Sequence, residues 1–134
     1  MAKSKPLKFI LNSNYATLKN DSNTPTVVVT VPSGDSIAGG AYRSYTADVT
    51  VGSKGAPMET QINYSIGTQR FTTGAIQVVE NAGTGTQYQG IVSIQRPTAT
   101  TARLRVDYFN GNVGSITTVA RTATAYIRTY LPPF

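Results

Sequence analysis

The sequence predicts an all-β protein, a single antiparallel β-sandwich or jelly roll with a basic N-terminal arm. Apolar and polar residues alternate with a period of two along much of the chain, and clusters of Gly, Pro, Asn and Ser separate these runs. The 3.6-residue period of an amphipathic helix is nearly absent, and 134 residues is the length of one domain. We therefore expect a sandwich domain over residues 24–134 and an arm, or an edge strand with a loop, over residues 1–23.

The runs TVVVTV and YRSYTADVTV give the clearest strands, because every second residue in each can face a core. Their expected core residues are Val27, Val29, Val31, Tyr45, Ala47, Val49 and Val51. Further strands are expected in TQINYSIG, GAIQVVE and QYQGIVSIQR. Their expected core residues are Ile62, Tyr64, Ile66, Ile76, Val78, Tyr88, Val92 and Ile94.

The stretch TARLRVDYFNGNVGSITTVARTATAY, residues 101–126, resembles two strands joined by a glycine-rich turn, and we expect a hairpin here. The expected core residues of its first strand and of the last strand of the chain are Leu104, Val106, Tyr108, Val119, Ala123, Ala125 and Ile127. The opposite face of the first strand carries Arg103, Arg105, Asp107 and Phe109.

The charge pattern indicates a protein that works in an assembly or on a surface. Only 13% of the residues are charged, about half of ordinary usage, and charge is what discourages self-association. The net charge of +6 is compatible with nucleic acid, an anionic glycan or an acidic protein surface as partner. Lysine dominates the first twenty residues and arginine the remainder, which is typical of a solvated arm on a rigid module.

The residue inventory argues against an enzyme. The chain contains no His and no Cys, which excludes Ser-His and Cys-His nucleophile systems and the usual zinc ligands. The six carboxylates are never closer than eleven residues apart in sequence, and a glycosidase needs two of them in a sizeable cleft. The best local candidate for calcium, the turn around Asp21, has one carboxylate. We expect no catalytic residue, no cofactor and no metal.

The sequence predicts neither a signal peptide nor a membrane-spanning segment. The apolar patch Phe9–Leu11 is too short for a signal peptide, and no apolar run is long enough to span a bilayer. We therefore expect no membrane association and no classical secretion signal.

Nucleic-acid binding would need basic residues interleaved with aromatic ones. The face with Arg103, Arg105, Asp107 and Phe109 offers one aromatic ring beside two arginines and an acid, which is a weak stacking platform. Nucleic acid is therefore disfavoured and kept as a second alternative.

The segment AYIRTYLPPF stays apolar and aromatic to Phe134, whereas chain ends are normally polar. Pro132 and Pro133 lie between Tyr130 and Phe134. Tyrosine and arginine are the residues enriched in protein interfaces. We expect this segment to be tucked into the fold or into a neighbouring molecule.

The Thr-, Gly- and Ala-rich composition, strands such as YRSYTADVTV and ATTARLRVDYFNG, and the apolar end resemble small virion proteins of tailed bacteriophages. These include head decoration (cement) proteins and the terminal sandwich domains of tail fibres and receptor-binding proteins. The resemblance implies a non-enzymatic protein that binds and stabilises the outer shell of the head, commonly as a trimer. It implies the major capsid protein or other virion proteins as partners, synthesis in the host cytoplasm and a final location on the capsid exterior.

We expect the arginine-bearing faces and the basic arm to contact acidic surfaces of the capsid protein or of a sister subunit, and the apolar end to add holding energy. The expected partner-binding residues are Lys3, Lys5, Lys8, Arg103, Arg105, Arg121, Arg128, Tyr130 and Phe134. The alternative is a receptor-binding or carbohydrate-binding sandwich of a tail or head fibre, although the absence of tryptophan counts against a sugar platform.

Overall fold

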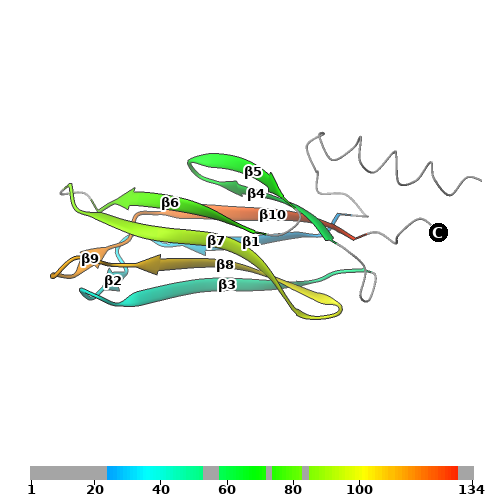
Figure 1. The fold of residues 1–134 in the computed structure, drawn as a ribbon, viewed down its shortest axis with the longest axis horizontal. Coiled ribbons are helices and arrows are strands. Elements are labelled where there is room, and N and C mark those ends of the chain that lie inside the picture. The colour runs from blue at the N-terminus through cyan, green and yellow to red at the C-terminus, as the bar shows by residue number, and fades with distance from the viewer. Residues whose placement is uncertain (1–23, 53–57, 72–73, 83–84, 130–134) are drawn as a thin grey trace, which may run out of the picture.

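The computed structural model of the chain describes residues 24–52, 58–71, 74–82 and 85–129. These residues form an antiparallel β-sandwich, which confirms the fold class predicted from the sequence (Figure 1). The strands are β1 (Thr26–Val31), β2 (Ser36–Ile37), β3 (Tyr42–Thr50), β4 (Met58–Tyr64), β5 (Gly67–Phe71), β6 (Ala75–Asn81), β7 (Gln87–Thr98), β8 (Thr101–Phe109), β9 (Ile116–Thr117) and β10 (Arg121–Thr129). The predicted arm lies outside the described residues.

The sandwich consists of two four-stranded sheets. The first sheet has the order β1-β10-β4-β5, and the second has the order β3-β8-β7-β6. The sheets pack through β1 and β10 of the first against β3 and β8 of the second. The short strands β2 and β9 pair with each other at the end of the sandwich where β3 begins and β8 ends (Figure 1).

The core is formed by the apolar face of each strand, as the alternating pattern predicts. Its buried hydrophobic residues are Val27, Val29, Val31, Ile37, Val51, Ile62, Tyr64, Val78, Tyr88, Val92, Ala102, Leu104, Val106, Tyr108, Ile116, Ala123, Ala125 and Ile127. Two expected core residues are placed wrongly. Val119, expected in the last strand, lies between β9 and β10 and is outside the core cluster. Ile66 continues the alternation of Ile62 and Tyr64 but lies in the turn between β4 and β5 and is exposed.

The predicted hairpin over residues 101–126 is wrong. Both strands exist, but β8 pairs with β3 and β7 in the second sheet, whereas β10 pairs with β1 and β4 in the first sheet. The connection between them is long enough to cross from one sheet to the other. On the way it forms β9, which pairs with β2 instead of allowing β8 and β10 to meet.

Asn110 fixes the start of this crossover. Its buried side-chain amide donates hydrogen bonds to the carbonyl oxygens of Ile37 and Gly114, each at 2.9 Å, and its Oδ1 accepts one from the backbone of Asn112. The chain therefore leaves β8 in a fixed direction, with the outward face of the second sheet ending beside β2 and β9.

Candidate functional site

The outer face of the second sheet carries the residues that alternate with the core. The register places Tyr42 opposite Phe109, and Gln89 opposite Phe109 on the other side. Further along the same strands, Ser44 lies opposite Asp107, and Asp48 lies opposite Arg103. The face is therefore apolar and aromatic near β2 and β9, and ionic toward its middle.

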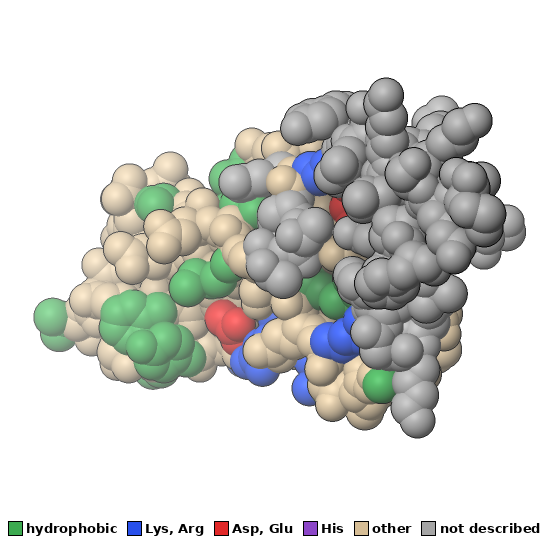
Figure 2. All heavy atoms as spheres, turned by 45° about the vertical axis from the view of Figure 1, so that its right-hand side comes forward, with side chains coloured by type: hydrophobic (Ala, Val, Ile, Leu, Met, Phe, Trp, Pro, Cys, Tyr) green, Lys and Arg blue, Asp and Glu red, His purple; other side chains and the backbone are tan. Residues whose placement is uncertain are grey.

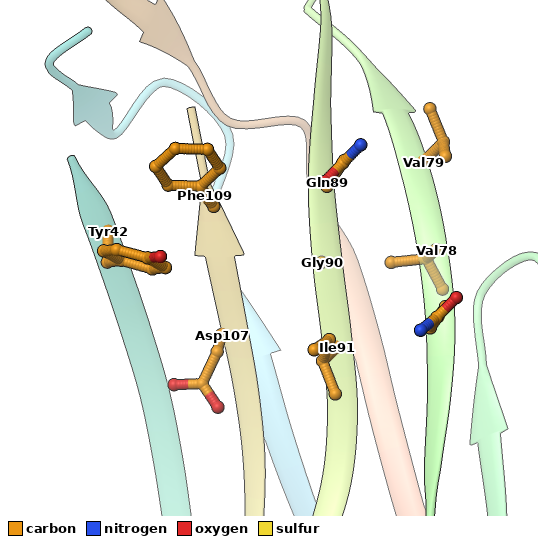
Figure 3. A pocket seen from close by; sticks show the side chains of 9 residues that line it. Tyr42, Val78, Val79, Gln89, Gly90, Ile91, Asp107 and Phe109 are labelled. Atoms are coloured by element: carbon orange, nitrogen blue, oxygen red, sulfur yellow. The ribbon is translucent and has the colours of Figure 1, made fainter. Parts of the chain in front are cut away.

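The apolar end is hollowed into a depression of about 340 Å³, which we call the apolar concavity. It is lined by Tyr42, Gln77, Val78, Val79, Gln89, Gly90, Ile91, Asp107 and Phe109 (Figure 3). Tyr42 is 74% exposed, and the ring centroids of Tyr42 and Phe109 are 4.7 Å apart at a tilt of 37°. Val79 and Ile91 form the other wall and are 53% and 45% exposed.

Hydrophobic side chains also gather at one end of the molecule in Figure 2, and acidic and basic side chains follow them toward the middle. A second, more polar hollow of about 610 Å³ adjoins the concavity along Val79, Gln89 and Phe109. Exposed apolar surface of this kind on one sheet face is typical of a binding surface.

The ionic strip beside the concavity consists of Asp48, Arg103, Ser44, Arg105 and Asp107. Arg103 binds both carboxylate oxygens of Asp48, at 2.8 and 3.1 Å. Arg105 binds both oxygens of Asp107, at 3.1 and 2.8 Å, and the Ser44 hydroxyl also donates to Asp107. These hydrogen bonds lower the pKa values of Asp48 and Asp107. Each arginine of the strip thus has its own carboxylate, and the strip presents no net positive charge.

Arg121 lies elsewhere and joins the two sheets through the core. From β10 it makes two hydrogen bonds of 2.9 Å to Glu80 of β6, a carboxylate that is 1% exposed. The Tyr64 hydroxyl donates to the same carboxylate at 2.6 Å and is hydrogen-bonded to the Tyr108 hydroxyl. This core network satisfies a charge that would otherwise be buried without partners.

The tyrosines of the core network stay protonated over the physiological range. Burial, followed by the hydrogen bond to Glu80, raises the pKa of Tyr64 far above its usual value. Burial also raises the pKa of Tyr108, to about 12. Neutral, enclosed hydroxyls of this kind act as structural donors rather than as nucleophiles.

Arg128 lies on the outer face of the first sheet, opposite Glu59 in the register between β10 and β4. Desolvation raises the pKa of Glu59, while the charges of Arg70 and Arg128 lower it. The predicted partner-binding arginines are thus distributed over three places, and only Arg103 and Arg105 lie side by side. Lys3, Lys5, Lys8, Tyr130 and Phe134 lie outside the described residues.

Metal-binding and membrane-spanning features were sought over the same residues. Within the described ranges, no group of three or more His, Cys, Asp or Glu side chains could hold a metal ion. None of the described residues belongs to a helix long and apolar enough to cross a membrane.

Sequence reasoning missed the apolar concavity because it depends on strand pairing. The sequence places Phe109 on the arginine face, where it lies in the structure. Its contact with Tyr42 becomes apparent only from the register of β3 with β8. Two adjacent pairs, Val78-Val79 and Ile91-Val92, break the strict alternation by adding an apolar residue on the outer side. That break is the sequence signal that could have located the surface.

In comparisons with known proteins, no protein-family model, no curated protein and no solved structure matches the chain.

Proposed function

We propose that this chain is a non-enzymatic structural protein of a tailed-bacteriophage virion, a decoration protein that binds and stabilises the outer shell of the head. The observation that carries the proposal is the outer face of the second sheet. There, an exposed aromatic concavity adjoins an ionic strip whose charges are already paired.

Such a face suits contact with protein. Covering Tyr42, Val79 and Ile91 removes apolar area from water, which stabilises a complex by roughly 25 cal/mol per Å² before the costs of association. Because Arg103 and Arg105 keep their carboxylates, a partner can cover the strip without leaving a charge unpaired. A concave apolar centre with a satisfied polar border is the usual anatomy of a protein interface.

The overall composition supports the same role. A surface made mainly of uncharged polar residues resists association weakly, and the net charge of +6 complements an acidic capsid surface. We expect the basic arm to make that electrostatic contact with the major capsid protein.

The test uses particles of the phage that encodes the chain. Deleting its gene should give heads that lack the protein and that lose their DNA more readily on heating or dilution of Mg²⁺. Adding the purified protein should restore its binding to these heads and their resistance. Purified protein that does not bind heads lacking it would contradict the proposal.

The alternative function is a receptor-binding or carbohydrate-binding module of a tail or head fibre. One observation favours it: the exposed Tyr42 ring lies beside the amides of Gln77 and Gln89, a combination that can stack on a sugar and hydrogen-bond its hydroxyls. Binding on a glycan array that is lost in Tyr42→Ala would favour this module over the decoration protein.

A further inference from the structure

We propose that the apolar concavity binds residues 130–134, Tyr-Leu-Pro-Pro-Phe, of a second copy of the chain, so that copies associate head to tail. The inference shares with the proposed function the premise that the outer face of the second sheet is an assembly surface. It adds the identity of one occupant and the direction in which subunits join.

The chemistry of the segment matches that of the concavity. Proline-rich, aromatic segments bind grooves lined by aromatic rings, because an extended proline helix is already ordered and loses little entropy. Pro132 and Pro133 have no backbone N–H, so few donors of the bound segment need partners. Tyr42 and Phe109 supply the aromatic wall, and the amides of Gln77 and Gln89 can donate to the carbonyl oxygens of the segment.

The segment of the same copy cannot reach the concavity. Thr129, where β10 ends, lies beside Gly52: a Cβ on that glycine would be 3.5 Å from the Thr129 hydroxyl. Gly52 lies two residues beyond Thr50, the last residue of β3, whereas Tyr42 is the first residue of that strand, roughly 30 Å away along an extended chain. Five extended residues span at most about 18 Å. In Figure 1, β10 accordingly runs away from the end where β2 and β9 lie.

A second copy is therefore the source of the segment, and the contact uses two different surfaces. Contacts of this heterologous kind close into a ring when the rotation per subunit allows it, and otherwise grow into a filament. Two copies that exchange their segments would close a dimer, and the trimer expected for a decoration protein is the next larger closed arrangement.

The experiment measures molar mass by light scattering after size exclusion. Three proteins are compared: the wild type, a variant that ends at Thr129, and the double variant Tyr42→Ser with Phe109→Ser. We expect an oligomer for the wild type and monomers for both variants. An equimolar mixture of the two variants should form a dimer that grows no further, because one variant retains the concavity and the other retains the segment.

Two controls keep the result interpretable. Val28→Ser removes an exposed apolar side chain from the other sheet and should leave the oligomer unchanged. If the variant that ends at Thr129 unfolds, Leu131→Ser with Phe134→Ser replaces it in the same mixture. A monomeric wild type, a truncated variant of unchanged mass, or a mixture that stays monomeric overturns the inference.

The outcome separates this inference from the proposed function. A monomeric wild type that still binds heads would overturn the head-to-tail contact and leave the decoration role intact. An oligomer with the head-to-tail contact that binds no phage heads would support this inference and overturn the decoration role.

Discussion

Two arginines of the sandwich differ in what their removal would leave behind. Arg121 is paired with a carboxylate that is 1% exposed, whereas Arg103 is paired with Asp48, whose side chain is 45% exposed. Water can replace a lost partner only at the second site. The stability that each arginine contributes therefore depends on how deeply its carboxylate is buried, and not on the N–O distance of the ion pair.

We predict that Arg121→Met lowers the free energy of unfolding by about 3 kcal/mol, because Glu80 stays buried, keeps the hydrogen bond from Tyr64 and loses the ion pair that compensates its charge. Arg103→Met should cost far less, because its pair with Asp48 is at the surface and screened by water. Urea denaturation of the two variants measures both values. Equal losses would contradict the structural role of the core network.

Adding Glu80→Gln to Arg121→Met should recover part of the lost stability, since the double variant buries no charge. A double variant less stable than Arg121→Met would show that Glu80 is not the source of the cost.

The buried tyrosines predict a loss of stability in alkali. The pKa of Tyr108 is raised to about 12, whereas tyrosine in the unfolded chain ionises near pH 10. Above about pH 10 the folded state thus holds a proton that the unfolded state has lost, so stability falls as pH rises toward 12. The contribution is fully present below about pH 10.

This effect is measured by urea denaturation between about pH 8 and pH 11, together with tyrosinate absorbance. Tyr108→Phe should show a shallower decline than the wild type, because one coupled proton has been removed. An identical decline in both proteins would contradict the assignment of the effect to Tyr108.

At the scale of elements, Gly90 of β7 shows how closely neighbouring strands are fitted. A Cβ at this position would lie 2.7 Å from the ring of Tyr108 on β8 and 2.9 Å from Val78 on β6. Both contacts point into the core, so the added methyl group cannot move into solvent.

We predict that Gly90→Ala costs about 1–3 kcal/mol of stability through overpacking. Gly67→Ala, at the start of β5 with no atom within 4 Å of the added Cβ, is the matched control and should change stability far less. Thermal unfolding of the two variants gives the comparison, and equal melting temperatures would refute the tight fit at Gly90.

The strands and their core faces could be predicted from the sequence because burial on one face imposes a period of two. Leu104, Val106 and Tyr108 are all fully buried, as their alternation predicts. The pairing could not be predicted in the same way. The apolar pattern of β8 is satisfied equally by β10 and by β3, and the choice depends on the crossover that Asn110 fixes.

The candidate site was less predictable than the fold for the same reason. The sequence places Arg103 and Arg105 on one outward face, and the structure agrees. Their partners come from β3 and from β8 itself, and the aromatic contact of Tyr42 with Phe109 arises only once β3 and β8 are in register. Side-chain type predicted an interface, whereas strand pairing determines where the candidate surface lies.

At the scale of the whole molecule, the sandwich has two different ends. The apolar concavity lies near β2 and β9, and β10 carries the chain toward the opposite end (Figure 1). A molecule of this kind can accept a neighbour's segment in the apolar concavity, while the ionic strip further along the same sheet face remains available to a shell. This polarity is compatible with both the proposed head-to-tail contact and the proposed role on a capsid.

The most direct test of the decoration role is the copy number of this chain in purified phage particles, measured by quantitative mass spectrometry against the major capsid protein. We predict a copy number of the same order as that of the capsid protein, because a decoration protein covers the whole shell. Particles that contain none of the chain, or only the few copies expected of a tail component, would contradict this function.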